Sequence, residues 1–218
     1  MKTGFLIFPG VTQLDFTGPI QMINLVPGMD VDLVWKDLNP VQTDAGFSVN
    51  PTMTIEEAPQ YDVILLPGGP GQSHILQDDA YLEFVRKQAE GAKYVVGVCT
   101  GSITLAKAGV LEGRKANSHW AYTQHLGEFG AEFVDQRVVV DGKFITGGGV
   151  TSGMDIALTF ISEMAGENAA KLIQLLVEYE PTPPFHAGRP ELAGEQLTQM
   201  ARAMIQANAP LFPANKGK

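Results

Sequence analysis

Short apolar runs recur along the first hundred residues and alternate with stretches of mixed polarity. Residues 4–8, 62–66 and 93–98 are almost continuously apolar, and each run is followed by Gly, Pro or a small polar residue. Such runs are typical of strands buried on both faces of a parallel sheet. A further strand is predicted at 30–36, where the sequence is Asp-Val-Asp-Leu-Val-Trp-Lys.

Helical periodicity fills the segments between these strands. We predict helices over roughly 18–26 and 79–90, a third near 100–108, and two more at 151–165 and 167–179. Apolar residues in the second helix recur on one face, opposite charged residues, as in a helix that packs against a sheet. The alternation of strand and helix predicts an α/β fold with a mostly parallel sheet.

Two segments predict hairpins added to this sheet. Residues 44–46, Asp-Ala-Gly, are typical of a turn between short strands. Residues 137–146 place two apolar runs on either side of Asp141-Gly142, a dipeptide suited to the positive φ angles of a hairpin turn.

The C-terminal part of the chain follows a different pattern. Four prolines within 181–190 exclude a regular helix there and predict a rigid strap. Beyond the strap, apolar residues recur at helical spacing, at Leu197, Met200, Ala201, Met204 and Ile205. We therefore expect a single α/β domain over 1–190, with a C-terminal helix and tail over 191–218 that pack on the same domain or on a partner subunit.

Composition and charge narrow the classes of protein. The chain has 218 residues, 44% of them hydrophobic, which is enough for one domain with a packed core. A formal net charge of −9 argues against binding to nucleic acid, whose phosphates attract clustered Lys and Arg. A single cysteine excludes an intramolecular disulfide, and the first apolar run is too short for a signal peptide or a membrane span. We expect a cytoplasmic protein with no membrane partner.

The strongest chemical motif is Gly97-Val98-Cys99-Thr100-Gly101. It lies where the strand at 93–98 ends and the next helix begins, and it has the pattern of a nucleophile elbow with cysteine in place of serine. An elbow of this kind needs small residues two positions before and after the nucleophile, because the backbone turns sharply there.

A thiol at the start of a helix is stabilised as the thiolate by the helix dipole and by unpaired N–H groups, so we expect a lowered pKa for Cys99. The alternative is that this cysteine is only a small buried apolar residue, as most free cysteines are.

A second glycine-rich turn, Pro67-Gly68-Gly69-Pro70-Gly71, follows the strand at 62–66. Neighbouring parallel strands end at the same edge of a sheet, so this turn is expected to face the elbow. We predict that the backbone amides of Gly69 and Thr100 form an oxyanion-binding pair, because Pro70 has no N–H. A plain tight turn is the alternative.

Asp15 lies between apolar residues, just after the first strand and before a helix. It is either a helix-start residue satisfied by local N–H groups or a partly buried acid at the same sheet edge as Cys99. In the second case both burial and the neighbouring thiolate raise its pKa, which suits it to transfer protons.

His119 follows the elbow by about twenty residues and is a candidate near the site. A Cys-His pair is the usual way to activate a thiol, but no Glu follows at the spacing of a Cys-His-Glu triad. The other histidines, His74, His125 and His186, show no metal-ligand spacing. We predict no metal and no other cofactor.

Five motifs in order resemble the ThiJ/PfpI superfamily. They are Leu-Asp-Phe-Thr-Gly-Pro, Leu-Pro-Gly-Gly-Pro-Gly, Gly-Val-Cys-Thr-Gly-Ser, Ser-His-Trp-Ala-Tyr and Thr-Gly-Gly-Gly-Val-Thr-Ser-Gly, and the resemblance extends through about residue 190. Within the superfamily, aspartate at position 15, the His-Trp-Ala-Tyr run and the proline-rich tail from Tyr179 are similar to the isonitrile (isocyanide) hydratases.

This resemblance implies a flavodoxin-like three-layer sandwich, similar to class I glutamine amidotransferases, and a homodimer without cofactor. It also implies the hydration of isonitriles to N-substituted formamides through a covalent thioimidate. Cys99 is then the nucleophile, Asp15 the acid and base, and Thr100 a supporting residue. Oxyanion and substrate binding is assigned to Gly68, Gly69, His119, Trp120 and Val150.

Other functions remain open from sequence alone. A glyoxalase- or deglycase-like enzyme would use the same cysteine on an α-oxoaldehyde, and a redox sensor would use it without a substrate. The ligand-sensing half of an AraC-type regulator shares these motifs, but only about 28 residues follow Pro190, too few for its DNA-binding part.

Overall fold

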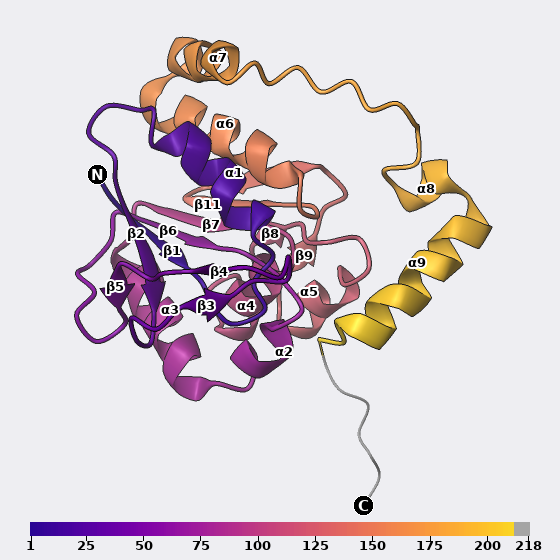
Figure 1. Ribbon diagram of the computed structural model, residues 1–218, viewed down its shortest axis with the longest axis horizontal. Helices are drawn as coiled ribbons and strands as arrows, with labels where there is room; N and C mark the ends of the chain where they lie inside the picture. Colours follow the sequence, from indigo (N-terminus) through magenta and orange to yellow (C-terminus); the bar gives the residue numbers. More distant parts are fainter. Residues whose placement is uncertain (212–218) are drawn as a thin grey trace, which may run out of the picture.

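The computed structural model describes residues 1–211 and is built around one seven-stranded sheet (Figure 1). The strand order is β10-β11-β7-β6-β1-β2-β5, and every neighbouring pair is parallel except β10 and β11. The strands are β1 Lys2–Leu6, β2 Asp30–Trp35, β5 Met53–Thr54, β6 Val63–Leu66, β7 Tyr94–Gly97, β10 Val138–Asp141 and β11 Phe144–Gly147. The predicted α/β class is confirmed.

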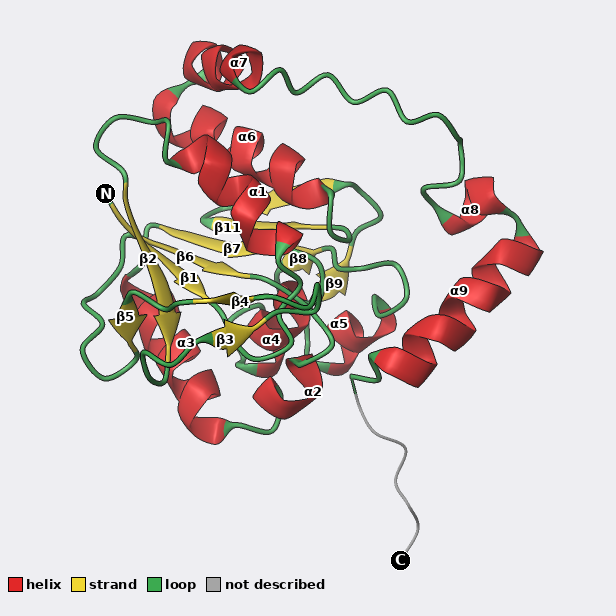
Figure 2. Ribbon diagram, viewed as in Figure 1, coloured by secondary structure: helices red, strands yellow, loops and turns green. Residues whose placement is uncertain are grey.

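Helices cover both faces of this sheet and complete the three predicted layers (Figure 2). On one face lie α1 Leu14–Ile23, α6 Ser152–Ala165 and α7 Glu167–Leu176. On the other lie α2 Gln72–Ile75, α3 Asp79–Gly91, α4 Gly101–Lys107 and α5 Gln124–Glu128. The strands β6 and β7 read as unbroken apolar runs because both of their faces are buried under these helices.

Both predicted hairpins form. The Asp141-Gly142 turn joins β10 to β11 in antiparallel pairing, and β11 continues the parallel sheet beside β7. The turn at 44–46 joins β3 Val41–Gln42 to β4 Ser48–Val49 in a separate two-stranded sheet, so the prediction that this hairpin adds to the main sheet is wrong. A second small sheet pairs β8 Lys115–Ala116 with β9 Glu132–Phe133 in parallel.

Several boundaries differ from the sequence-based prediction: β1 is Lys2–Leu6 where 4–8 was predicted, and the first helix ends at Ile23 where 26 was predicted. The first helix begins at Leu14, four residues before the predicted start, so Pro19 lies inside it and Asp15 in its first turn. The helix α7 ends at Leu176, short of the predicted 179, and Glu178 adopts a positive φ of 51° just beyond it. Pro190 starts the short helix α8 Pro190–Ala193, because proline is tolerated at the first helical position.

The last described segment, residues 177–211, is termed the C-terminal arm. It runs from α7 as an extended strap and then forms α8 and α9 Glu195–Asn208, away from the sheet (Figure 1). Its end returns to the domain, where the Tyr122 hydroxyl donates a hydrogen bond to the Ala209 carbonyl and Leu211 is only 3% exposed.

The apolar stripe predicted for the last helix is split in the structure. Ala201 and Ile205 are half-buried, whereas Leu197, Met200 and Met204 are exposed over more than half of their surface. Packing on the same domain or on a partner subunit therefore stays a prediction for this helix, and the part of the predicted tail at 212–218 lies outside the described residues. Among the described helices none has the length and apolar character to cross a membrane.

Candidate active site

The predicted site residues meet at the carboxyl ends of three neighbouring strands. In the sheet, β6 lies between β1 and β7. The turn carrying Gly68 and Gly69 follows β6, Cys99 follows β7, and Asp15 stands in the helix reached from β1. This is the edge at which ligands bind in open parallel sheets.

The elbow has the tight geometry that its glycines predict. Cys99 adopts a φ of 57°, which is uncommon for a residue with a side chain. A Cβ atom at Gly101 would lie 1.9 Å from the Leu66 carbonyl oxygen, and one at Gly97 would lie 2.7 Å from Ser102 Oγ. Only glycine fits at both positions, so the turn that presents Cys99 is fixed by its two glycine neighbours and by β6.

Backbone groups surround the cysteine on every side. Its N–H donates to the Gly148 carbonyl at 2.9 Å, and its own carbonyl accepts from Ser118 Oγ at 2.8 Å. The amides of Thr100 and Val150 both hydrogen-bond to the thiol. The sulfur therefore lies between two N–H donors that can stabilise negative charge on it or on an atom attached to it.

Asp15 is fully buried beside this thiol. Its Oδ2 accepts a hydrogen bond from the Gly68 N–H at 2.8 Å, while Oδ1 has no donor at ordinary hydrogen-bond geometry among the described residues. Burial raises the pKa of Asp15 from 3.8 to about 7, although the Gly68 N–H and the Cys99 thiol partly oppose the shift. A carboxyl with this pKa exchanges protons readily near neutral pH.

The thiol behaves differently from the sequence-based expectation. Burial and the nearby Asp15 carboxylate raise the pKa of Cys99 well above its ordinary value, outweighing the amides of Val150 and Thr100, which lower it. Cys99 is only 5% exposed, and the loss of water around the thiol outweighs the stabilisation that the helix start gives to the thiolate. Cys99 and Asp15 therefore form a coupled acid pair, and ionising both at once is unfavourable.

The glycine-rich turn is held against the elbow through Thr100. A Cβ atom at Gly68 would lie 2.4 Å from Thr100 Oγ1, so this close approach requires glycine. The Gly69 N–H donates to the same oxygen at 3.3 Å, and the hydroxyl donates onward to Gln72 Oε1 at 3.3 Å. The Gly69 amide, predicted as half of an oxyanion-binding pair, thus has an internal acceptor, and the Val150 amide takes the place beside Thr100.

Gln72 is a buried residue that the sequence analysis did not single out. Its Nε2 donates to the Thr100 carbonyl at 3.0 Å and to Thr104 Oγ1, so the side chain ties α2 to the start of α4. The only signal in the sequence is a polar residue directly after the glycine-rich turn. Nothing in its local pattern indicates a partner some thirty residues away.

His119 lies close to the elbow but is not a cation at neutral pH. Burial lowers its pKa to about 4, and its Nδ1 accepts the Ala121 N–H at 3.2 Å. Its ring lies against Gly149, where an added Cβ atom would come within 2.5 Å of His119 Cδ2. The proton of the neutral ring is therefore on Nε2, so His119 can donate one hydrogen bond but cannot serve as a charged acid.

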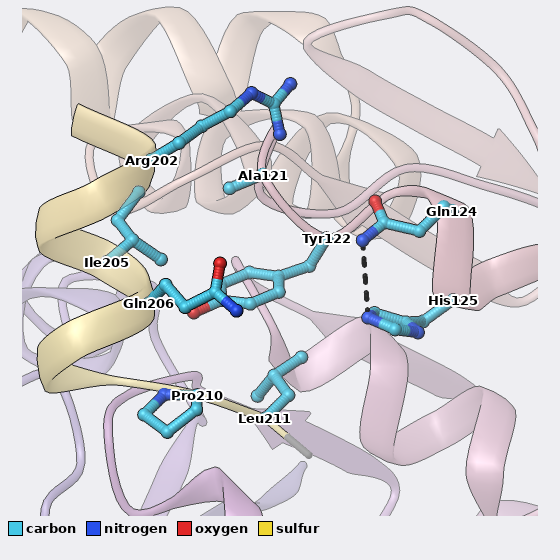
Figure 3. A pocket seen from close by; sticks show the side chains of 9 residues that line it. All are labelled: Ala121, Tyr122, Gln124, His125, Arg202, Ile205, Gln206, Pro210 and Leu211. Carbon is cyan, nitrogen blue, oxygen red and sulfur yellow. Dashed lines mark hydrogen bonds between the residues drawn. The ribbon is translucent and has the colours of Figure 1, made fainter. Parts of the chain in front are cut away.

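A cavity of about 520 Å³ opens next to these residues and is termed the outer cavity. Its inner wall includes Ser118, His119 and Val150, and its outer wall includes Trp120 and residues 188–191 and 202 of the C-terminal arm. A second cavity of about 320 Å³ lies behind Tyr122, between α5 and α9 (Figure 3). Within residues 1–211, no three His, Cys, Asp or Glu side chains cluster as metal ligands would.

Comparison with known proteins adds sequence relationships to this geometry. The chain is 47% identical to an isonitrile hydratase from Pseudomonas putida over 93% of its own length and 89% of that protein. It is 28% identical to a deglycase from Thermococcus kodakarensis over 67% of its own length and 89% of that enzyme.

Solved structures support the same relationship. A ThiJ/PfpI family protein from Pseudomonas syringae superposes with a TM-score of 0.92 at 36% identity, covering 96% of this chain and 88% of that one. The sequence profile of the DJ-1/PfpI family matches residues 1–163. This chain belongs to the DJ-1/PfpI family.

Proposed function

We propose that this protein is an isonitrile hydratase that converts isonitriles to N-substituted formamides, with Cys99 as nucleophile and Asp15 as acid and base. One observation carries the proposal: a fully buried carboxyl with a pKa of about 7 is coupled to the only cysteine of the chain. The 47% identity to an isonitrile hydratase over nearly the whole chain supports the same substrate class.

The first half of the reaction uses the one proton that the acid pair shares. The Asp15 carboxylate takes the proton of the Cys99 thiol, and the thiolate attacks the terminal carbon of the isonitrile and forms a C–S bond. Asp15 then gives that proton to the same carbon. The product is a thioimidate, in which the carbon carries hydrogen, sulfur and a double bond to nitrogen. Asp15 is left as the carboxylate.

The second half returns the site to its starting state. The Asp15 carboxylate removes a proton from water, whose oxygen adds to the thioimidate carbon, and the nitrogen takes that proton. The carbonyl then forms as the C–S bond breaks, and the proton of the new hydroxyl returns to Asp15. Asp15 passes this proton to the departing sulfur, so the formamide leaves with the thiol and the carboxylate restored, and no external electron donor or acceptor is required.

The backbone positions these groups for the chemistry. The amides of Thr100 and Val150 stabilise negative charge on the sulfur as it attacks and as it departs. The Gly68 N–H holds Asp15 Oδ2, so Oδ1 is the oxygen left to exchange protons. The hydroxyl of Thr100 serves as a relay for the incoming water, and neutral His119 and Trp120 bind the substituent on nitrogen.

Two further features belong to this proposal. The enzyme acts as a homodimer, which the exposed leucines and methionines of α7 and α9 support, and light scattering at micromolar concentration tests it. It acts in the cytoplasm, which its single free thiol supports. Subcellular fractionation of the native host tests that location.

The decisive experiment is intact-protein mass spectrometry after brief mixing with a simple isonitrile, together with detection of the formamide. We expect one added substrate mass on the wild type and none on Cys99→Ala. Formamide production without any dependence on Cys99 would refute the mechanism, and the absence of both adduct and formamide would refute the substrate class.

A further inference from the structure

The charged side chains that line the outer cavity do not all have a partner of opposite charge. Three arginines line it, at positions 137, 189 and 202, against two carboxylates, Asp135 and Glu191. His119 is neutral there because burial lowers its pKa. Asp155, just outside the lining, adds a third carboxylate beside Arg137, so cations and anions are equal in number and the distinguishing property is which guanidinium has no carboxylate partner.

Two of the three arginines are already neutralised by neighbouring carboxylates. Arg137 Nε lies 2.6 Å from Asp155 Oδ2. Arg189 contacts both carboxylate oxygens of Asp135 at 2.7 and 2.8 Å, and it lies 3.5 Å from Glu191. These pairs fix the walls of the cavity and leave neither guanidinium free to bind an anion.

Arg202 is different. Among residues 1–211 its guanidinium makes no ion pair and no hydrogen bond, and the guanidinium carbon lies 4.8 Å from the centre of the Trp120 ring. Figure 3 shows its side chain leaving α9 and reaching toward the loop that carries Ala121. Stacking on an aromatic face leaves the N–H donors at the edge of a guanidinium available for an anion.

The same cavity extends from this guanidinium to residues that contact the nucleophile. Ser118, which binds the Cys99 carbonyl, and Val150, whose amide contacts the thiol, lie on its inner wall, while Trp120 and Arg202 lie on its outer wall. A volume of about 520 Å³ is within the range of small-molecule pockets and holds a substituent several carbons long.

From this arrangement we propose that the enzyme selects isonitriles whose substituent carries a carboxylate, and that Arg202 on the Trp120 ring binds that carboxylate. This inference rests on the proposed function and names the substrate class. The isonitrile group itself is uncharged, so the group that distinguishes one substrate from another must be on the substituent. A planar guanidinium matches a carboxylate with two parallel hydrogen bonds.

The test compares 6-isocyanohexanoate with its uncharged methyl ester. We expect the wild type to have a kcat/KM about tenfold higher for the acid, as is typical of a charge-assisted hydrogen bond in a partly sheltered site. The preference should weaken as ionic strength rises, because salt screens an interaction that is open to solvent. Turnover of both compounds without any preference would overturn the inference while leaving the proposed function intact.

Variants locate the preference. Arg202→Gln should reduce the acid-to-ester ratio to about one, and Arg202→Lys should retain part of it, because the charge remains without the planar fork. Trp120→Leu should lower the ratio partway by releasing the guanidinium. The matched control is Arg86→Gln, which removes an exposed arginine of α3 outside the cavity and should keep the wild-type ratio. An unchanged ratio in Arg202→Gln would contradict the assignment.

Binding gives a readout that does not depend on turnover. Calorimetric titration of Cys99→Ala with 6-formamidohexanoate, the product of the acid, and with its methyl ester should show tighter binding of the acid. The difference should disappear in the double variant with Arg202→Gln. Equal binding of acid and ester by Cys99→Ala would overturn the inference even if no isonitrile is converted.

Discussion

The catalytic centre and the outer cavity differ in burial and in the groups that form them. Cys99 and Asp15 are almost completely buried, held by backbone hydrogen bonds, and surrounded by glycines whose replacement would cause backbone clashes. The outer cavity is half-open, lined by charged and aromatic side chains, and closed on one side by an arm whose α9 contains no buried residue. The first region is suited to fixed proton transfer, and the second to recognition of variable substituents.

The largest effect is expected at the nucleophile. Cys99→Ala should abolish turnover, because the thiolate makes the covalent bond, and it should leave the fold intact because only one small buried atom is lost. Formamide formation and circular dichroism check the two parts of this prediction. Residual activity above a few per cent in a pure, folded sample would overturn the role of Cys99.

Asp15 should follow closely. Asp15→Asn preserves shape but cannot deliver the proton, and general acid–base catalysis is typically worth ~10²–10⁴-fold. Asp15→Glu restores the acid but displaces it by one methylene, which should cost ~10²-fold. Single-turnover rates of adduct and formamide formation check the expected order Asp, then Glu, then Asn. Near-normal rates in Asp15→Asn would show that another group transfers the proton.

The same buried carboxyl should make the stability of the protein depend on pH. Because the pKa of Asp15 is about 7 in the folded protein and about 3.8 when exposed, the folded state binds more protons between these values. The stability of the wild type should therefore fall as pH rises from 4 to 7, by up to about 4 kcal/mol. Asp15→Asn has no carboxyl at this position, so its stability should not show this fall with pH.

Urea unfolding at pH 4.5 and pH 8 checks this prediction. The stability of Asp15→Asn relative to the wild type should be greater at pH 8 than at pH 4.5. Such a result would also show that the lost activity of this variant is not due to unfolding. A relative stability that does not change with pH would mean that Asp15 is not held in a dry site.

The smallest effect is expected where the elbow meets the glycine-rich turn. Thr100→Val keeps the backbone amide at the thiol but leaves the Gly69 N–H and Gln72 Oε1 without their partner. Loss of the hydroxyl should slow turnover on the order of tenfold without abolishing it. The matched control is Thr104→Val, which removes a hydroxyl that Gln72 also contacts but which lies one turn farther along α4. Equal rates in the two variants would argue against a relay through Thr100.

Local sequence pattern was sufficient where the backbone itself makes the site. The spacing of Gly97, Cys99 and Gly101 indicates a strand-to-helix turn, and the parallel strands bring Gly68 and Asp15 to the same edge. Each of these features depends on residues close in sequence or on strand order, which apolar patterning reveals.

Properties that depend on contacts distant in sequence were not predictable in the same way. The direction of the thiol pKa depends on how completely Cys99 is buried, and the engagement of the Gly69 amide depends on the rotamer of Thr100. Gln72 reaches its partners across some thirty residues, and Arg202 meets Trp120 only because the arm folds back. No periodicity or motif encodes these contacts.

Apart from Trp120, the outer wall of the cavity comes from one segment of the chain, at residues 188–191 and 202. In the arrangement that we propose, most of the substrate selectivity therefore lies in a segment of the chain separate from the residues that carry out the reaction. Exchanging this stretch between relatives as a cassette would graft one protein's substrate preference onto another's reaction without disturbing the elbow, the glycine-rich turn or the sheet. For the engineering of new isonitrile specificities, such chimeras are a shorter route than random changes around Cys99, where the backbone tolerates almost none.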